Sequence, residues 1–175
     1  MRDNQTAEAM TALEQARATL RQLMDDPEER QRASVIYAEN AAWLHELARL
    51  MGRSVEYAAL TAEAVQIASE AVEREAGNLG ALRSRALLRS RLAGEALDHH
   101  NYVKAETLAR ETAVDWTEFL RFDPSNDTAI NNRRVAGSMA AQALWRQGKF
   151  DEAIELSRVN TKDAITHGGA PSTLW

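Results

Sequence analysis

The chain has 175 residues, a formal net charge of −5 and no cysteine. This length suits one domain with a substantial core, and the missing cysteines exclude disulfides, thiolate zinc sites and a cysteine nucleophile. The mild acidity lacks the basic excess expected of a nucleic-acid binder, and no apolar run approaches the ~20 residues of a membrane-spanning helix. A composition dominated by Ala, Leu, Glu and Arg, with three prolines, predicts an all-α fold.

The first residues, 1–5, precede no apolar stretch of the kind found in secretory signals. We therefore expect a cytoplasmic protein, with no membrane and no nucleic acid among its partners.

Apolar residues recur at three- and four-residue steps along most of the chain, which predicts a series of amphipathic helices. The second helix has the clearest start signal, because Asp26 can cap it, Pro27 suits its first position and Glu29 can complete a capping box. Ser54 and Asn101 are candidate caps of the third and fifth helices. The predicted helices cover residues 6–24, 27–51, 54–76, 80–99, 102–122, 126–147 and 150–166.

An internal repeat of 48 residues relates these helices to one another. Gly52, His100 and Gly148 end three helices at this spacing, and a glycine there supplies a left-handed helix stop. The buried stripes agree with the same register, as shown by Ala33, Ala81 and Ala129 and by Leu60, Leu108 and Leu156.

The repeat predicts how a single domain over residues 1–175 is organised. Residues 1–26 form an N-terminal capping helix, and residues 27–77, 78–124 and 125–169 form three helical hairpins. The tail, residues 170–175, ends on Leu174 and Trp175, which either fold back over the last helix or leave an open end that could drive self-association.

The turn of the third hairpin carries a family resemblance. Gly148, Phe150 and Ala153 have the spacing that opens the second helix of a tetratricopeptide repeat, and the stretch 123–126, Asp-Pro-Ser-Asn, resembles that family's inter-repeat turn. The resemblance implies a right-handed superhelix of antiparallel hairpins that binds proteins, and no enzyme activity or cofactor. The repeat exceeds the family's period of about 34 residues, by roughly two helical turns in each helix.

In that family the first helix of each hairpin lines a concave groove that holds peptides. Carrying the groove face over by the repeat register implies an acidic and aromatic part, a basic part and an amide-rich part, which together could hold an extended peptide. Ordinary solvated helix faces are the alternative interpretation. The implied groove residues are Glu39, Trp43 and Glu46, then Arg83, Ser84 and Arg91, and then Asn131, Asn132, Ser138 and Gln142.

Two charged clusters have competing interpretations. Four arginines between positions 83 and 91 could contact phosphates, but salt bridges to acidic neighbours on the third and fifth helices explain them more simply. Asp98-His99-His100 resembles a metal cluster, but adjacent helical residues point about 100° apart and rarely hold one ion. We therefore predict no metal site and, because no nucleophile has a base beside it, no catalytic site.

The favoured function is a scaffold that binds a protein or peptide partner. A self-associating structural module, giving a homo-oligomer, is one alternative. A ligand-sensing regulatory domain of a larger bacterial-type signalling protein is another.

Overall fold

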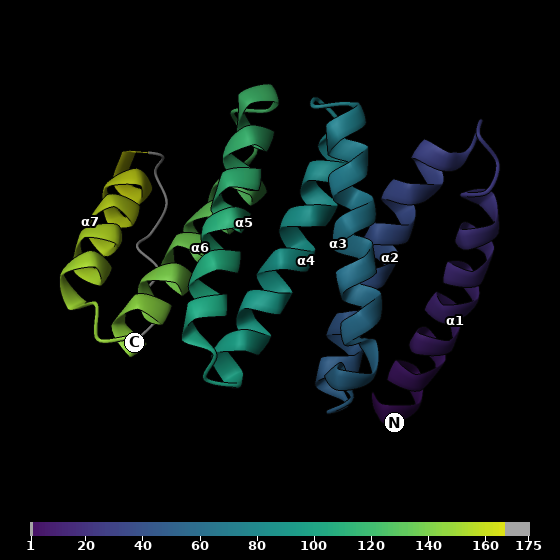
Figure 1. Ribbon diagram of the computed structural model, residues 1–175, viewed down its shortest axis with the longest axis horizontal. Helices are drawn as coiled ribbons and strands as arrows, with labels where there is room; N and C mark the ends of the chain where they lie inside the picture. Colours follow the sequence, from purple (N-terminus) through teal and green to yellow (C-terminus); the bar gives the residue numbers. More distant parts are fainter. Residues whose placement is uncertain (1, 167–175) are drawn as a thin grey trace. The chain divides into compact units, whose positions relative to one another are not determined.

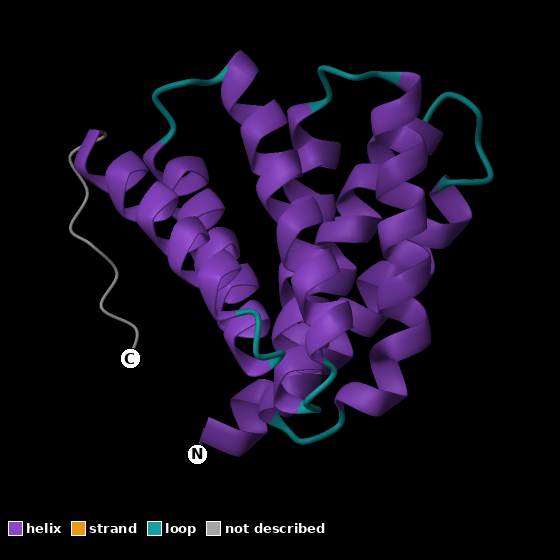
Figure 2. Ribbon diagram, turned by 60° about the vertical axis from the view of Figure 1, so that its left-hand side comes forward, coloured by secondary structure: helices purple, strands orange, loops and turns teal. Residues whose placement is uncertain are grey.

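The computed structural model describes residues 2–166, and this part of the chain is helical with no strand (Figure 2). The predicted all-α fold of seven helices is confirmed, and most helix ends lie within two residues of their predicted positions. The predicted tail, residues 170–175, lies outside the described residues. The helices are α1 (Arg2–Leu23), α2 (Arg30–Leu50), α3 (Ser54–Arg74), α4 (Leu79–Asp98), α5 (Tyr102–Phe122), α6 (Asp127–Arg146) and α7 (Phe150–Thr166).

Two predicted helix starts are wrong in detail. Asp26 accepts a hydrogen bond from the backbone N–H of Glu28 (2.9 Å), so it closes a turn and α2 begins only at Arg30. Glu29 makes no capping bond with its side chain. Ser54 is the first residue of α3 and caps nothing, because a preceding backbone turn already fixes the start of this helix.

The same left-handed turn recurs at the three positions that the repeat relates. Gly52, His100 and Gly148 have φ of 70°, 59° and 79°, and they are the positive-φ residues of the described chain. In each turn the following N–H donates to the carbonyl five residues back, as in the bond from Arg53 to Ala48 (2.7 Å). This pattern is a Schellman motif. Glycine is usual at its left-handed position, because it has no Cβ atom to clash with the backbone at positive φ.

The turns between hairpins also repeat. Asn78 and Asn126 lie one repeat apart and cap α4 and α6, because their side-chain oxygens accept from the N–H groups of Ala81 (3.0 Å) and Ala129 (2.9 Å). The longer turn between α1 and α2 lacks such an asparagine, so the turns that precede the hairpins are alike only in the second and third repeats.

The chain divides into two compact units, residues 1–91 and 92–175, with the boundary inside α4. In the first unit α2 packs against both α1 and α3, and in the second unit α6 packs against both α5 and α7 (Figure 1). The single domain predicted over residues 1–175 stays a prediction.

The core of the first unit joins α1, α2 and α3 with the first half of α4. Tyr37 and Leu44 of α2 are fully buried there, and α4 contributes Leu88. Two buried polar bonds add specificity: Asn40 of α2 donates to the carbonyl of Leu13 in α1 (3.1 Å), and His45 of α2 bonds Thr61 of α3 (2.9 Å).

The core of the second unit consists largely of alanines. Ala93 of the second half of α4 packs with Ala109 of α5 and Ala140 of α6, and Ala96 packs with Ala105 and Ala143 in the same way. Small side chains let helix axes approach closely. Leu156 of α7 also packs against the first of these clusters, so α7 contributes to this core as well.

Helix α1 makes the same kind of contact as the second helix of a hairpin, whereas the repeat predicts a capping helix that lies outside the repeat. Arg53, which follows the first left-handed turn, donates to the sulfur of Met10 in α1 (4.0 Å). Two repeats further along, Lys149 contacts Glu106 in α5 (3.2 Å) across the same 43 residues of sequence. The contact of α1 with the hairpin of α2 and α3 thus matches the contact of α5 with the hairpin of α6 and α7.

Candidate interaction surface

The charged and aromatic residues predicted on the second and fourth helices lie together in the first unit. Glu39, Trp43 and Glu46 share one face of α2, because they are spaced by four and three residues. Two arginines of α4 pair with these carboxylates: Arg83 Nη1 lies 3.4 Å from Glu39 Oε1, and Arg91 Nη1 lies 2.5 Å from Glu46 Oε2. These five residues are called the α2–α4 cluster below.

Trp43 is the aromatic residue of this cluster, and its side chain is 52% exposed. The guanidinium carbon of Arg91 lies 5.7 Å from the centroid of the indole ring, within range of a cation–π interaction. Glu46 fixes Arg91 from its other side. The indole ring therefore has a charged contact within its own unit, while about half of the residue stays exposed to solvent.

The ionisable groups of the cluster hold one another charged. A hydrogen bond from Arg49 is the main cause that lowers the pKa of Glu46; burial opposes it, and the charge of Arg91 adds to it. Burial lowers the pKa of Arg91 and Glu46 acts in the opposite direction, but a guanidinium stays protonated in proteins. Glu46 is thus an ionised bridge between Arg49 and Arg91.

Ser84 corrects the predicted set, because it is only 2% exposed and cannot contact a peptide. Ala81 and Leu88 lie three residues before and four residues after it, and both are buried. Ser84 therefore belongs to the core-facing stripe of α4. The neighbouring Arg83 points to the exposed side.

The amide residues predicted on the sixth helix belong to the second unit. Asn131 and Gln142 are exposed, and Asn132 is half-buried. Asn131, Ser138 and Gln142 share one face of α6 by their spacing. Backbone groups of an extended peptide could bond the two exposed amides.

Ser138 is engaged at the contact between α6 and α7. The side-chain N–H of Asn160 in α7 donates to the carbonyl of Arg134 (3.0 Å) and to the hydroxyl of Ser138 (3.4 Å). Gly137 makes room for this amide, since a Cβ there would overlap it. The groove assignment of Ser138, which is half-buried, stays a prediction. A glycine inside a predicted helix was the available sign of this close approach.

The third left-handed turn presents an exposed pair of aromatic residues. Phe150 packs edge-on against Trp145 at 4.8 Å between ring centroids, and the two side chains are 51% and 54% exposed. Ala153 is buried beneath the turn. Phe150 thus contributes to the surface of the second unit as well as to the turn.

Nearby, an acidic residue that sequence reasoning missed joins α5 to the turn between α6 and α7. Glu106 of α5 accepts from Gln147 (2.9 Å), Lys149 (3.2 Å) and Arg110 (3.0 Å). Burial alone would raise the pKa of Glu106, but these hydrogen bonds together lower it. The 48-residue register gives no sign of this network, because it matches Glu106 with Ala58.

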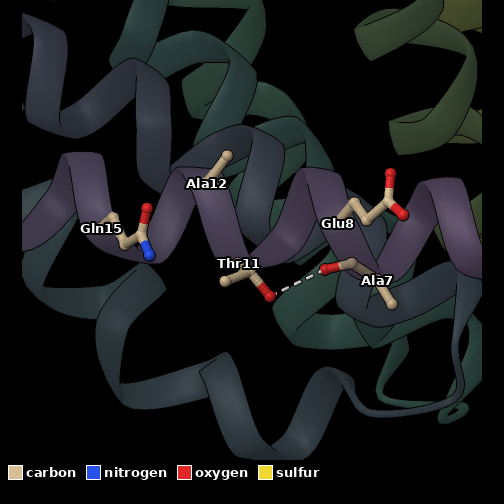
Figure 3. Close-up of a pocket in the computed structure, with 5 residues that line it drawn as sticks. All are labelled: Ala7, Glu8, Thr11, Ala12 and Gln15. Atoms are coloured by element: carbon tan, nitrogen blue, oxygen red, sulfur yellow. Dashed lines mark hydrogen bonds between the residues drawn. The ribbon is translucent and has the colours of Figure 1, made fainter.

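A hollow of about 400 Å³ on α1 offers few groups that could bind a ligand (Figure 3). Its lining comes from one helix, every lining residue is exposed, and the Thr11 hydroxyl is bonded to the carbonyl of Ala7 (3.0 Å). Glu8 is its ionisable group. The lining residues are Ala7, Glu8, Thr11, Ala12 and Gln15.

Arg83 and Arg91 form their ion pairs with α2, and not with the third and fifth helices as the sequence interpretation supposes. Among residues 5–162, whose side chains the structure describes, no group of three His, Asp or Glu side chains is arranged to hold a metal ion. In the same range, no helix combines the length and apolar character needed to cross a bilayer.

Comparison with known proteins gives no relative: no family model, curated protein or solved structure matches the chain. The resemblance to tetratricopeptide repeats stays a prediction.

Proposed function

We propose that this chain is a protein-interaction module that binds a segment of a partner protein non-covalently, with the α2–α4 cluster as its anchor. The observation that carries the proposal is the half-exposed ring of Trp43, fixed by Arg91 and Glu46. Tryptophan and arginine are the residue types most enriched at binding hot spots. Because packed helices already hold these side chains, binding would cost little ordering entropy.

The chemistry of the cluster indicates what a partner segment would offer. An apolar or aromatic side chain would cover the open part of the Trp43 ring. The pair of Arg83 with Glu39 lies partly exposed and can exchange its bond for a charged group of the partner. In the second unit, the exposed amides of Asn131 and Gln142 offer separate contacts for peptide backbone.

The tetratricopeptide-like resemblance supports the same proposal, because first hairpin helices carry the ligand in that family. The alternative of self-association through the chain's end depends on residues 170–175, which lie outside the described residues.

Peptides selected by the whole chain from a random display library would test this function. We expect the selected peptides to lose about tenfold or more in affinity for Trp43→Ala, as is usual for a hot-spot aromatic residue. Arg91→Ala should also bind more weakly, because it releases the ring. Phe122→Ala is the matched control, since Phe122 is 52% exposed and lies outside the cluster. Peptides that bind Trp43→Ala as tightly as the parent chain would refute the proposal.

A further inference from the structure

A second hollow lies in the second unit, where α4 ends and α5 begins. It has a volume of about 250 Å³, and the last turns of α6 form its other wall. Unlike the hollow on α1, it draws its lining from three helices and a turn. The lining residues are Leu97, Asp98, His100, Tyr102, Gln142 and Arg146.

Three polar side chains of this hollow are exposed to solvent and have no partner among the described residues. Asp98 and Arg146 form no ion pair with each other or with another charge, and the amide of Gln142 forms no hydrogen bond. The carboxylate of Glu106, whose side chain is only 15% exposed, accepts three hydrogen bonds within the chain. The hollow thus holds a negative charge, a positive charge and an amide that bind nothing within the chain.

His100 supplies an independent observation. It adopts the left-handed conformation with φ of 59°, at the position where the other two repeats have Gly52 and Gly148. A side chain in this conformation costs stability that glycine avoids. The imidazole Nδ1 lies 3.0 Å from the hydroxyl of Tyr102, which fixes the ring at the wall of the hollow. Strained backbone of this kind is often found at functional sites, so the exception at this one repeat makes His100 a candidate binding residue.

We propose that this hollow binds a small zwitterion of the amino-acid class. The ligand's ammonium group would pair with Asp98 and its carboxylate with Arg146, and charge-assisted hydrogen bonds of this kind are the strong ones. Gln142 and the imidazole of His100 would bond the remaining polar atoms. The volume lies below the roughly 300–1,000 Å³ of pockets for drug-sized ligands, so it suits a single amino acid. The site lies in the second unit and does not depend on the α2–α4 cluster.

Calorimetric titration of the full chain with a graded series of probes tests this. Glycine, β-alanine and γ-aminobutyrate carry the same two charges at increasing separation, whereas acetate and methylammonium each carry one. We expect at least one zwitterion to bind about tenfold more tightly than either single-charge probe. Absence of binding at millimolar concentration, or acetate binding as tightly as the best zwitterion, would overturn the proposal.

Charge-removing variants locate the site. Asp98→Asn and Arg146→Gln should each weaken binding of the best zwitterion about tenfold. Asp151→Asn and Arg158→Gln make the same changes on α7, outside the hollow, and should leave the affinity unchanged. Equal loss in both sets would show that the probe senses only overall charge, and the site would be refuted.

His100→Gly separates binding from folding. Glycine restores the residue of the other two repeats, so this variant should unfold at the same or a higher temperature than the parent chain. Its affinity for the zwitterion should nevertheless fall, because the imidazole is gone. A His100→Gly chain that binds the zwitterion with parental affinity would contradict the role assigned to His100.

Discussion

At the scale of single residues, Glu46 organises the α2–α4 cluster. Its carboxylate accepts from Arg49 on its own helix (3.1 Å) and from Arg91 on α4 (2.5 Å). The second bond holds the guanidinium over the ring of Trp43. A charge on Glu46 therefore fixes the contact of two helices and the orientation of an exposed aromatic residue.

Replacing Glu46 with Gln should reveal how much its charge contributes to the free energy of unfolding, because that contribution depends on pH. The pKa of Glu46 is lowered in the folded chain, so its stabilisation is present above the ordinary carboxyl pKa and is lost as the pH falls through the lowered value. We expect Glu46→Gln to reduce the free energy of unfolding by about 1 kcal/mol at about pH 7 and by much less at about pH 3. Urea unfolding at the two pH values measures the difference.

Glu70→Gln is the control for this experiment. Glu70 forms an ion pair with Arg74 and accepts a hydrogen bond from Gln66, both on its own helix and at an exposed site, and such pairs contribute little. A deficit of Glu46→Gln that is equally large at both pH values would contradict the assignment to an ionised bridge.

Helical spacing was sufficient to predict that Glu39, Trp43 and Glu46 share a face, because the spacing depends on α2 alone. It was not sufficient to predict which arginine meets which carboxylate, or that Ser84 is buried. Those outcomes depend on the rotation of α4 about its axis, which is set by packing of Ala81 and Leu88 into the core.

At the scale of whole elements, the contact between α6 and α7 depends on one missing side chain. Gly137 lies inside α6, and the amide of Asn160 fills the space that a Cβ would need. That amide donates to the carbonyl of Arg134, so it ties α7 to the backbone of α6. A helix-weakening glycine is thus retained where it allows a bond between helices.

The effect of Gly137→Ala on stability should change sign with the residue at position 160. In the parent chain the new methyl group displaces the amide of Asn160, and we expect a net loss of about 1 kcal/mol. In an Asn160→Ala background nothing is displaced, and the higher helix propensity of alanine should add about 0.5–1 kcal/mol. Chemical unfolding of the four chains in this double-mutant cycle measures both effects. Additive changes would show that Gly137 and Asn160 do not interact.

The ends of most elements were predictable because their signals are local. Asn101 caps α5 by accepting from the N–H of Lys104 (3.3 Å), and the left-handed stops follow the 48-residue register. The place of α1 was not predictable, because it depends on packing with residues far along the chain, such as Met10 in the common core and the bond from Asn40 to Leu13. The late start of α2 follows from the turn at Asp26, which a start signal alone does not distinguish from a cap.

At the scale of the whole molecule, the described chain has a core in each of its two compact units. Leu88 of α4 belongs to the core of the first unit, whereas Ala93 and Ala96 of the same helix belong to that of the second. In repeat proteins stability is approximately a sum of local terms and contacts between neighbours. A core defect should therefore act mainly within the unit that contains it.

Leu44 and Leu144 provide a matched pair for testing this, because both are fully buried leucines, one in each unit. Truncation of either to alanine should cost about 2–5 kcal/mol. Native-state hydrogen exchange should then show where the loss falls. We expect Leu144→Ala to reduce amide protection in α5, α6 and α7 while α1, α2 and α3 keep theirs, and Leu44→Ala to give the reverse pattern. If each variant lowered protection equally in both units, the chain would unfold as one cooperative body. The two compact units would then differ in packing but would not be independent in stability.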